Sequence, residues 1–300
     1  MNTLTRDKRL SLVDAPSNLG LRPPARDVVP GTYKAPWALR DAGLLERLGA
    51  KDAGAVVPPR YVATWKPGDG VRNGPAIADY ARKLADRLAV VRRAGDFPVV
   101  LGGDCSILLG PMLALRRDGR FGLAYVDAHT DFREPANSPY VGSAAGEDLA
   151  LVTGRGDGYL VDIDGLKPYV RDEDVVQLGA RDEDDLRDFV ETGIRMRTSA
   201  HIIADGTDAT LAAAAEVLVR PDLDGFWLHI DADILDPSVL GAVDTPTPGG
   251  LDRRQLTDLV RGLLTLPGAA GLEITIFDPD LDPTGTQAAL LTDILVDILR

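Results

Sequence analysis

Short runs rich in valine, isoleucine and leucine alternate with longer segments of helical period along this 300-residue chain. This alternation is typical of a parallel sheet that is covered by helices on both faces. No linker divides the sequence, so we expect one α/β domain over residues 1–300 with a central, mainly parallel, eight-stranded sheet. The predicted strands lie near residues 9–15, 54–57, 97–103, 121–128, 174–180, 201–204, 226–233 and 271–277. The predicted helices cover residues 75–95, 106–118, 184–193, 208–219, 252–264 and 285–299, and the Pro/Gly-rich stretches 15–36 and 132–160 are predicted to be long loops.

Composition excludes several classes of partner. The formal net charge of -13 argues against nucleic acid, because no stretch rich in lysine and arginine offsets repulsion from phosphate. No apolar run is long enough to cross a bilayer, and the first residues lack the apolar core of a signal peptide. Cys105 is the single cysteine, so no internal disulfide is possible, which fits a reducing compartment. We therefore expect a cytoplasmic protein without a nucleic-acid or membrane partner.

Two predicted strands end in alternating metal-binding residue types. The string "VDAHTD" places Asp127, His129 and Asp131 at every second position, and "HIDAD" repeats the pattern with Asp231 and Asp233. Side chains two apart share one face of an extended segment, and crowded carboxylates require a positive charge between them. Aspartates are also common in turns, but two strands that each deliver such a set predict a pair of divalent ions. Oxygen-rich sites with some imidazole suit manganese.

Long strings of this chain resemble the ureohydrolases, the group that includes arginase, agmatinase and formimidoylglutamate hydrolase. The strings are "LGGDCS", "YVDAHTD", "VVQLGARD", "HIDADILDPSVLGAVDTPTPGGL" and "GLEITIFDPDLD". The resemblance implies a three-layer α/β/α domain, two Mn²⁺ ions and homo-oligomers, usually trimers or hexamers. It also implies that a hydroxide bridging the two metals hydrolyses a C–N bond of a small guanidino or amidino compound.

The resemblance also implies roles for individual residues. Asp127, Asp131 and Asp231 match the carboxylates that bridge the metals, and His129 and Asp233 match ligands of one metal. The family's histidine ligand of the first metal, within "GGDHS", is replaced here by Cys105.

We expect Cys105 to remain a metal ligand and to favour zinc, iron or cobalt over manganese. The alternative is that Cys105 is a small buried residue beside a site with one metal or none. His229 lies two residues before Asp231 and faces the same side, so it could support or replace the missing imidazole. A histidine in such a strand is also commonly a packed, hydrogen-bonded core residue.

The substrate-binding residues depart from the family pattern at Ile276, where arginases and agmatinases place a glutamate that pairs with the guanidinium. An aliphatic side chain cannot hold a cation. The scissile group is then neutral or weakly basic, as in a hydroxyguanidine, or the charge comes from another acid, the candidates being Glu273, Asp278 and Asp280.

Proton transfer is affected by Ala145, which stands where arginases have the histidine of "GNLHG". Proton handling would then fall to Asp131, the expected catalytic residue, or to water.

Two further positions concern the substrate's tail. Arg133 follows the metal strand where arginase has an asparagine that helps to bind the substrate carboxylate, and formimidoylglutamate hydrolases also have arginine there. An arginine fork suits a carboxylate. Asp184 matches an arginase aspartate that holds the substrate's α-amino group, although aspartate is also favoured in the first turn of a helix.

The leading hypothesis is therefore a binuclear-metal amidinohydrolase whose substrate carries a carboxylate. One alternative is a non-catalytic relative that keeps a metal for stability or assembly, and another is a metal-dependent amide hydrolase. The replacements at Cys105, Ala145 and Ile276 count toward the non-catalytic relative.

Overall fold

The centre of the molecule is one eight-stranded sheet in which every pair of neighbouring strands is parallel. The computed structural model describes residues 9–134, 137–138, 142–181, 186, 189 and 192–300. The strand order is β2-β1-β3-β8-β7-β4-β5-β6, which confirms the predicted parallel α/β class. The strands are β1 Leu10–Ala15, β2 Lys51–Ala55, β3 Phe97–Gly102, β4 Gly122–Val126, β5 Val175–Gly179, β6 Arg195–Thr198, β7 Phe226–Asp231 and β8 Ala269–Thr275.

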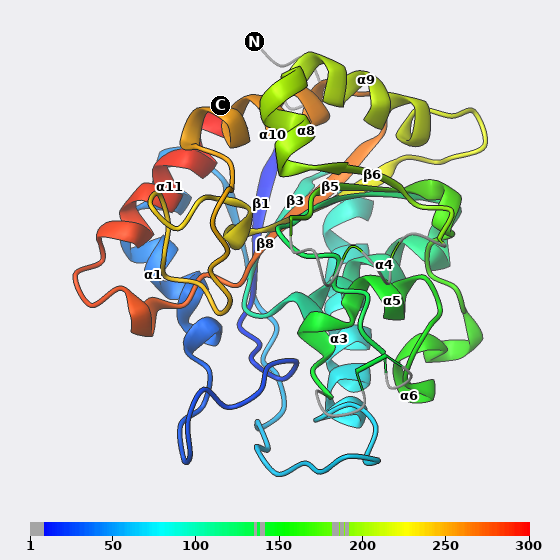
Figure 1. Cartoon of the computed structure of the whole chain (residues 1–300), viewed down its shortest axis with the longest axis vertical. Helices are drawn as coiled ribbons and strands as arrows, with labels where there is room; N and C mark the ends of the chain where they lie inside the picture. The colour runs from blue at the N-terminus through cyan, green and yellow to red at the C-terminus, as the bar shows by residue number, and fades with distance from the viewer. Residues whose placement is uncertain (1–8, 135–136, 139–141, 182–185, 187–188, 190–191) are drawn as a thin grey trace.

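Helices cover both faces of the sheet (Figure 1). Helices α1, α2 and α8 to α11 form the layer on one face of the sheet, and helices α3 to α6 form the layer on the opposite face. The α-helices are α1 Ala35–Asp41, α2 Leu44–Leu48, α3 Gly74–Arg93, α4 Leu109–Asp118, α5 Asp148–Val152, α6 Gly158–Val161, α8 Ser199–Asp205, α9 Thr207–Leu218, α10 Arg253–Thr265 and α11 Thr286–Leu299. The 3₁₀ helices are η1 Gly31–Lys34, η2 Cys105–Leu108, η3 Ala144–Gly146, η4 Ile163–Gly165, η5 Asp172–Asp174, η6 Ala232–Ile234 and η7 Pro279–Leu281.

The central strands are mostly apolar because both of their faces are covered. Every residue of β3, β4 and β7 is buried. Phe226 and Trp227 are neighbours in β7 and pack into opposite layers, as the two-residue repeat of a strand requires. The edge strands β2 and β6 are short and more exposed than the central strands. Short edge strands discourage pairing with another chain.

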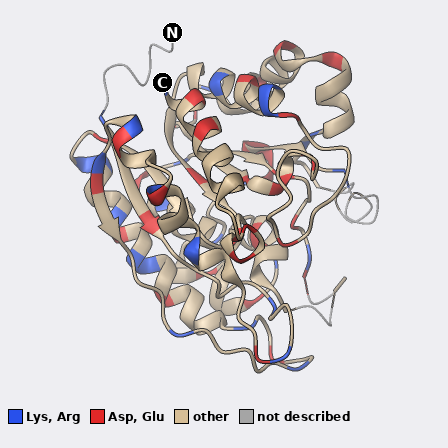
Figure 2. Ribbon diagram, turned by 90° about the vertical axis from the view of Figure 1, so that its left-hand side faces the viewer, with Lys and Arg blue, Asp and Glu red and all other residues tan. Residues whose placement is uncertain are grey.

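Lysine and arginine are interspersed with aspartate and glutamate along the helices (Figure 2). Arg117 of α4, for example, contacts Asp86 of α3 at 2.8 Å and Asp164 at 2.7 Å. Exposed ion pairs of this kind each contribute about 0–1 kcal/mol, so the apolar layers dominate the stability of the fold. No helix among the described residues has the length and apolar character that a membrane span requires.

Three expectations about local structure are wrong. Residues 201–204 belong to helix α8 rather than a strand, because Thr198 Oγ1 accepts a hydrogen bond from the His201 backbone N–H and starts the helix directly after β6. The segment 132–160, predicted to be a long loop, contains η3, α5 and α6. Strand β2 covers Lys51–Ala55 instead of residues 54–57. The helix predicted over 184–193 falls largely outside the described residues.

Candidate metal centre

The candidate ligands converge because neighbouring strands of the sheet position them. Strands β3, β8, β7 and β4 lie side by side and run in the same direction. Their carboxyl ends therefore meet at one edge, where ligands of open α/β sheets collect. Cys105 follows β3, Asp127 to Asp131 follow β4, Asp231 ends β7 and Ile276 follows β8.

The first group of candidate ligands contains Asp127, His129 and Asp233. His129 Nδ1 lies 3.0 Å from Asp233 Oδ2 and 3.7 Å from Asp127 Oδ1, and its Nε2 lies 3.2 Å from Thr247 Oγ1. Among the protein groups alone, burial opposes the charge on the imidazole, but Asp233 and Asp127 raise the pKa of His129 above its ordinary value. A divalent cation would take the place of the proton that charges the His129 imidazole, since histidine and aspartate bind metals as neutral imidazole and carboxylate.

The second group contains Cys105, Asp127, His229 and Asp231, whose ligand atoms all lie within 4.8 Å of one another. Cys105 Sγ lies 2.8 Å from Asp231 Oδ2 and 3.2 Å from Thr275 Oγ1. Burial, reinforced by the carboxylate of Asp231, raises the pKa of the Cys105 thiol well above its usual value. Only a nearby cation would therefore make it a thiolate.

The third group contains Cys105, Asp131 and Asp148. The Tyr125 hydroxyl lies 2.9 Å from Asp131 Oδ2 and 2.8 Å from Asp148 Oδ1. A phenol has one hydrogen to donate, so two contacts of this length are satisfied when one of the carboxyls carries a proton. Burial, followed by the charge of Asp127, raises the pKa of both Asp131 and Asp148 well above the usual range.

Several buried atoms of these groups are suited to cations. Asp127 Oδ2, Asp148 Oδ2 and His229 Nε2 are buried and have no hydrogen-bond partner among the described residues. Burial and the charges of Asp233 and Asp127 raise the pKa of Asp231. Unpaired acceptors and crowded carboxylates are costly in an apolar core unless protons or cations neutralise them. The donor set therefore fits divalent metal ions, and two overlapping groups could each hold one.

A cavity of about 500 Å³ opens above these residues. It is lined by His129, Asp131, Asp231 and Asp233, and also by Ala145 and Ile276. Further lining residues are Leu21, Arg22, Pro23, Pro24, Arg133, Ser143, Gly146, Asp244 and Thr245. The volume suits a small molecule.

Two residues of the cavity have left-handed backbone conformations. Asp131 has a φ of 42° and Ile276 has a φ of 67°. Such conformations cost about 1–3 kcal/mol in residues other than glycine, and they cluster at functional sites. The Ile276 conformation is held in place by a hydrogen bond of 2.7 Å from its backbone N–H to the carbonyl oxygen of Gly103.

The residues proposed for the substrate occupy different places. Arg133 lines the cavity, whereas Asp184 lies outside the described residues. The three acids considered as substitutes for a glutamate at position 276 do not line it. Glu273 is buried against His229, Asp278 accepts a hydrogen bond from the Gly31 N–H, and Asp280 pairs with Lys34.

Sequence reasoning missed four residues near the site. Asp148 joins a ligand group, Arg22 and Asp244 line the cavity, and Arg181 donates hydrogen bonds to the carbonyl oxygens of Asp233 and Thr247. Asp148 lies at the start of a helix, where aspartate usually serves the helix itself. Asp244 lies in a proline-rich turn, a common place for aspartate. Neither local pattern indicates a site.

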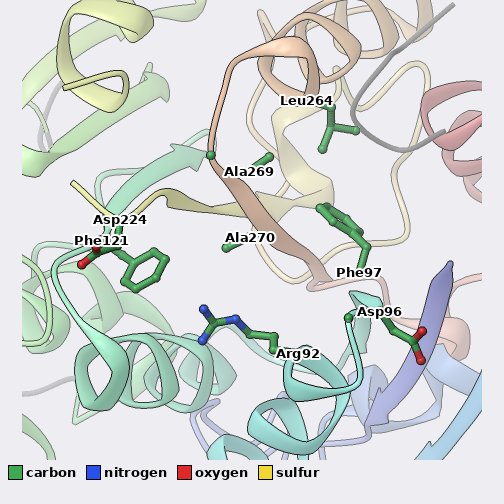
Figure 3. Close-up of a pocket in the computed structure, with 10 residues that line it drawn as sticks. Arg92, Asp96, Phe97, Phe121, Asp224, Leu264, Ala269 and Ala270 are labelled. Carbon is green, nitrogen blue, oxygen red and sulfur yellow. The ribbon is translucent and has the colours of Figure 1, made fainter. Parts of the chain in front are cut away.

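A second pocket, of about 250 Å³, lies at the opposite edge of the sheet (Figure 3). Its lining includes Phe97 and Ala269, the first residues of β3 and β8, and the Arg92 guanidinium lies 5.1 Å from the centre of the Phe121 ring. None of the candidate metal-ligand groups found in the described part of the chain lies there. The carboxyl edge is therefore the stronger candidate for chemistry.

The fold and the site together define a three-layer α/β/α protein with a carboxylate-rich candidate metal centre at the carboxyl edge of its parallel sheet. The profile of the arginase family matches residues 12–300, and the chain belongs to this family.

Individual relatives agree with this assignment. The chain is 31% identical to an arginase of Bacillus caldovelox over 94% of this chain and 95% of the relative. The solved native structure of the Bacillus caldovelox arginase superimposes with a TM-score of 0.86 at 30% identity, over 97% of this chain and 98% of that chain. The arginase of Bacillus subtilis superimposes with a TM-score of 0.84 at 28% identity, over 98% of each chain.

Proposed function

We propose that the chain is a hydrolase that uses two divalent cations to cleave a C–N bond of a small guanidino or amidino compound. The observation that carries this proposal is the cluster of overlapping ligand groups, four of whose residues line a cavity of about 500 Å³. The similarity to arginases over nearly the whole chain supports the same reaction class. Two such cations would supply a water that is reactive at neutral pH and positive charge that stabilises the developing oxyanion.

The proposed ligands divide between two ions. His129 and Asp233 would hold one ion, Cys105 the other, and Asp127, Asp131 and Asp231 would lie between them. The group with Asp127, His129 and Asp233 is rich in oxygen, so we expect Mn²⁺ there.

Asp131 is the proposed proton carrier. Its side chain lines the cavity and one of its oxygens lies 2.9 Å from the Tyr125 hydroxyl. This hydrogen bond fixes the carboxyl group where it can receive a proton from the attacking water and deliver it to the leaving amine. Ala145 also lines the cavity and cannot take part in proton transfer.

The cavity also indicates what kind of substrate fits. Arg22 and Arg133 both line it, and guanidinium groups suit a carboxylate on the substrate. Ile276 presents an aliphatic surface in place of a negative charge. We therefore propose an acidic tail and a scissile group that is neutral or weakly basic.

The proposal is tested by metal analysis combined with a substrate screen. The purified chain is reconstituted with Mn²⁺, and guanidino and amidino acids are screened for release of urea, formamide or ammonia. We expect two metal ions per chain and turnover of at least one compound. Asp131→Asn should then lower kcat by at least about 100-fold, because general acid–base catalysis contributes that much.

The matched control is Asp208→Asn, which removes an exposed carboxylate of helix α9 and should leave kcat unchanged. Bound metal with no turnover of any compound would favour a non-catalytic member of the family. A chain that binds no metal after reconstitution would overturn the proposal.

A further inference from the structure

We infer that Cys105, His229, Asp127 and Asp231 form a four-ligand site that selects Zn²⁺ over Mn²⁺, with His229 supplying the imidazole from strand β7. The inference deepens the proposed function and rests on it, because it assigns different ions to the two halves of the centre. It begins from the side chain of His229, which is fully buried and which the proposed reaction does not otherwise use.

The surroundings of His229 fix the orientation of its ring. The ring stacks on Tyr125 with a centroid separation of 4.5 Å and an interplanar angle of 8°. Its Nδ1 lies 2.9 Å from Glu273 Oε1 of the neighbouring strand β8. A histidine that ligates a metal through one nitrogen typically donates the other N–H to a carboxylate, which fixes the tautomer and increases the basicity of the ligand.

The free nitrogen of His229 points to an atom that also lacks a partner. His229 Nε2 lies 3.9 Å from Asp127 Oδ2, and neither atom has a hydrogen-bond partner in the described part of the chain. This distance is too long for a hydrogen bond. When Nδ1–H donates to Glu273, both atoms present lone pairs to the same small buried space, which a cation would satisfy.

Cys105 and Asp231 complete the site from the strands on either side of β8. Cys105 Sγ lies 2.8 Å from Asp231 Oδ2, and both side chains are at most 2% exposed. The four ligand atoms, one sulfur, one nitrogen and two oxygens, all lie within 4.8 Å of one another. Sulfur, imidazole and carboxylate ligands suit Zn²⁺, which can expand its coordination to admit a further ligand, and a thiolate favours Zn²⁺ over Mn²⁺.

The other half of the centre differs in its donors. Asp127, His129 and Asp233 offer carboxylate oxygens and one imidazole and no sulfur. Asp127 belongs to both groups and could join them. The two halves therefore differ in the softness of their ligands, and the structure points to a mixed centre.

The test uses Co²⁺ as a spectroscopic substitute for Zn²⁺. The full chain is freed of metal and titrated with Co²⁺ in the presence of excess Mn²⁺. We expect one Co²⁺ per chain with a near-ultraviolet charge-transfer band from the Cys105 thiolate. Cys105→Ser should abolish the band while circular dichroism shows an intact fold, and Cys105→His should shift the binding preference toward Mn²⁺.

The role of His229 is tested by affinity. His229→Gln should weaken Co²⁺ binding about 10-fold or more, and Glu273→Gln should weaken it about 10- to 100-fold through the loss of the second hydrogen bond. His201→Gln, which removes an exposed imidazole of helix α8, should leave affinity and band unchanged. Asp233→Asn should lower Mn²⁺ content without changing the band.

Two results would overturn the inference. One is a wild-type chain that binds two Mn²⁺ in preference to Co²⁺ and shows no thiolate band. The other is an intact band and unchanged Co²⁺ affinity in both His229→Gln and Glu273→Gln. A thiolate band in a chain that turns over no guanidino or amidino acid would support the inference and count against the proposed function. Turnover by a chain without the thiolate band would support the proposed function and count against the inference.

Discussion

Ile276 combines an unfavourable backbone conformation with a position on the cavity wall. The residue is 4% exposed and has a φ of 67°, which a β-branched side chain adopts at a cost of about 1–3 kcal/mol. The hydrogen bond to Gly103 keeps the backbone in place, so the side chain points into the cavity beside the candidate ligands. The proposed preference for a neutral or weakly basic scissile group rests on this aliphatic side chain.

Replacing Ile276 by glutamate tests this proposed preference. Ile276→Glu should improve kcat/KM for compounds with a fully charged guanidinium about 10- to 100-fold, because a charge-assisted hydrogen bond contributes about 1.5–3 kcal/mol. The effect is measured by urea release from a series of guanidino compounds that differ in basicity. Ile276→Gln introduces a side chain of nearly the same shape as glutamate but without its charge, and should give little gain in kcat/KM. An equal response to both substitutions would show that charge at this position does not select the substrate.

At the scale of elements, one carboxylate makes several of the hydrogen bonds that hold the segment between η6 and α10. Asp236 accepts hydrogen bonds from the backbone N–H groups of Ser238 at 3.0 Å, Gly249 at 2.9 Å and Gly250 at 3.2 Å. The Ser238 side chain, followed by these N–H groups, lowers the pKa of Asp236 to about 2. Residues 244 and 245 of this segment line the cavity, so Asp236 holds a segment that contributes to the cavity lining.

Asp236→Asn should make stability less dependent on pH. A carboxylate whose pKa is lower in the folded chain stabilises it above the unfolded pKa of about 4, and this contribution disappears as the pH falls toward 2. Urea unfolding should therefore show a less stable variant at pH 7 and a smaller difference from the wild type at pH 3. Asp208→Asn on the exposed side of α9 provides the control. A difference between Asp236→Asn and the wild type that stays constant from pH 7 to pH 3 would contradict the assignment.

At the scale of the whole molecule, the candidate ligands come from segments that meet only in the folded chain. Cys105, Asp127 and Asp231 follow or end strands β3, β4 and β7, which are far apart in the sequence. An unfolded chain holds no such arrangement, so cations would bind almost exclusively to the native state. Metal binding should therefore stabilise the fold as well as support the reaction.

Removing metal should lower the thermal stability of the chain. With free ion at about 1,000 times its Kd, binding to the native state contributes about 4 kcal/mol. Treatment with EDTA should lower Tm, and added Mn²⁺ or Zn²⁺ should restore it, as measured by calorimetry. Asp233→Asn should show a smaller change in Tm on metal removal than the wild type, because this substitution weakens one half of the centre. An unchanged Tm after complete removal of metal would show that these carboxylates are neutralised by protons alone.

The sequence by itself determined the parallel α/β class, because strand periodicity acts over a few residues. Strand alternation does not account for the placement of Asp131 and Asp233, since β4 ends at Val126, Asp131 has a φ of 42° and Asp233 lies in η6. The sequence did not determine helix α8, since two isoleucines fit a strand and a helix equally well and a single cap decided between them. The tertiary structure decided that Glu273 contacts His229, 44 residues away, and that Asp148 joins Tyr125 and Asp131. These contacts depend on which strands are neighbours and on where the loops pack, and no local pattern encodes either.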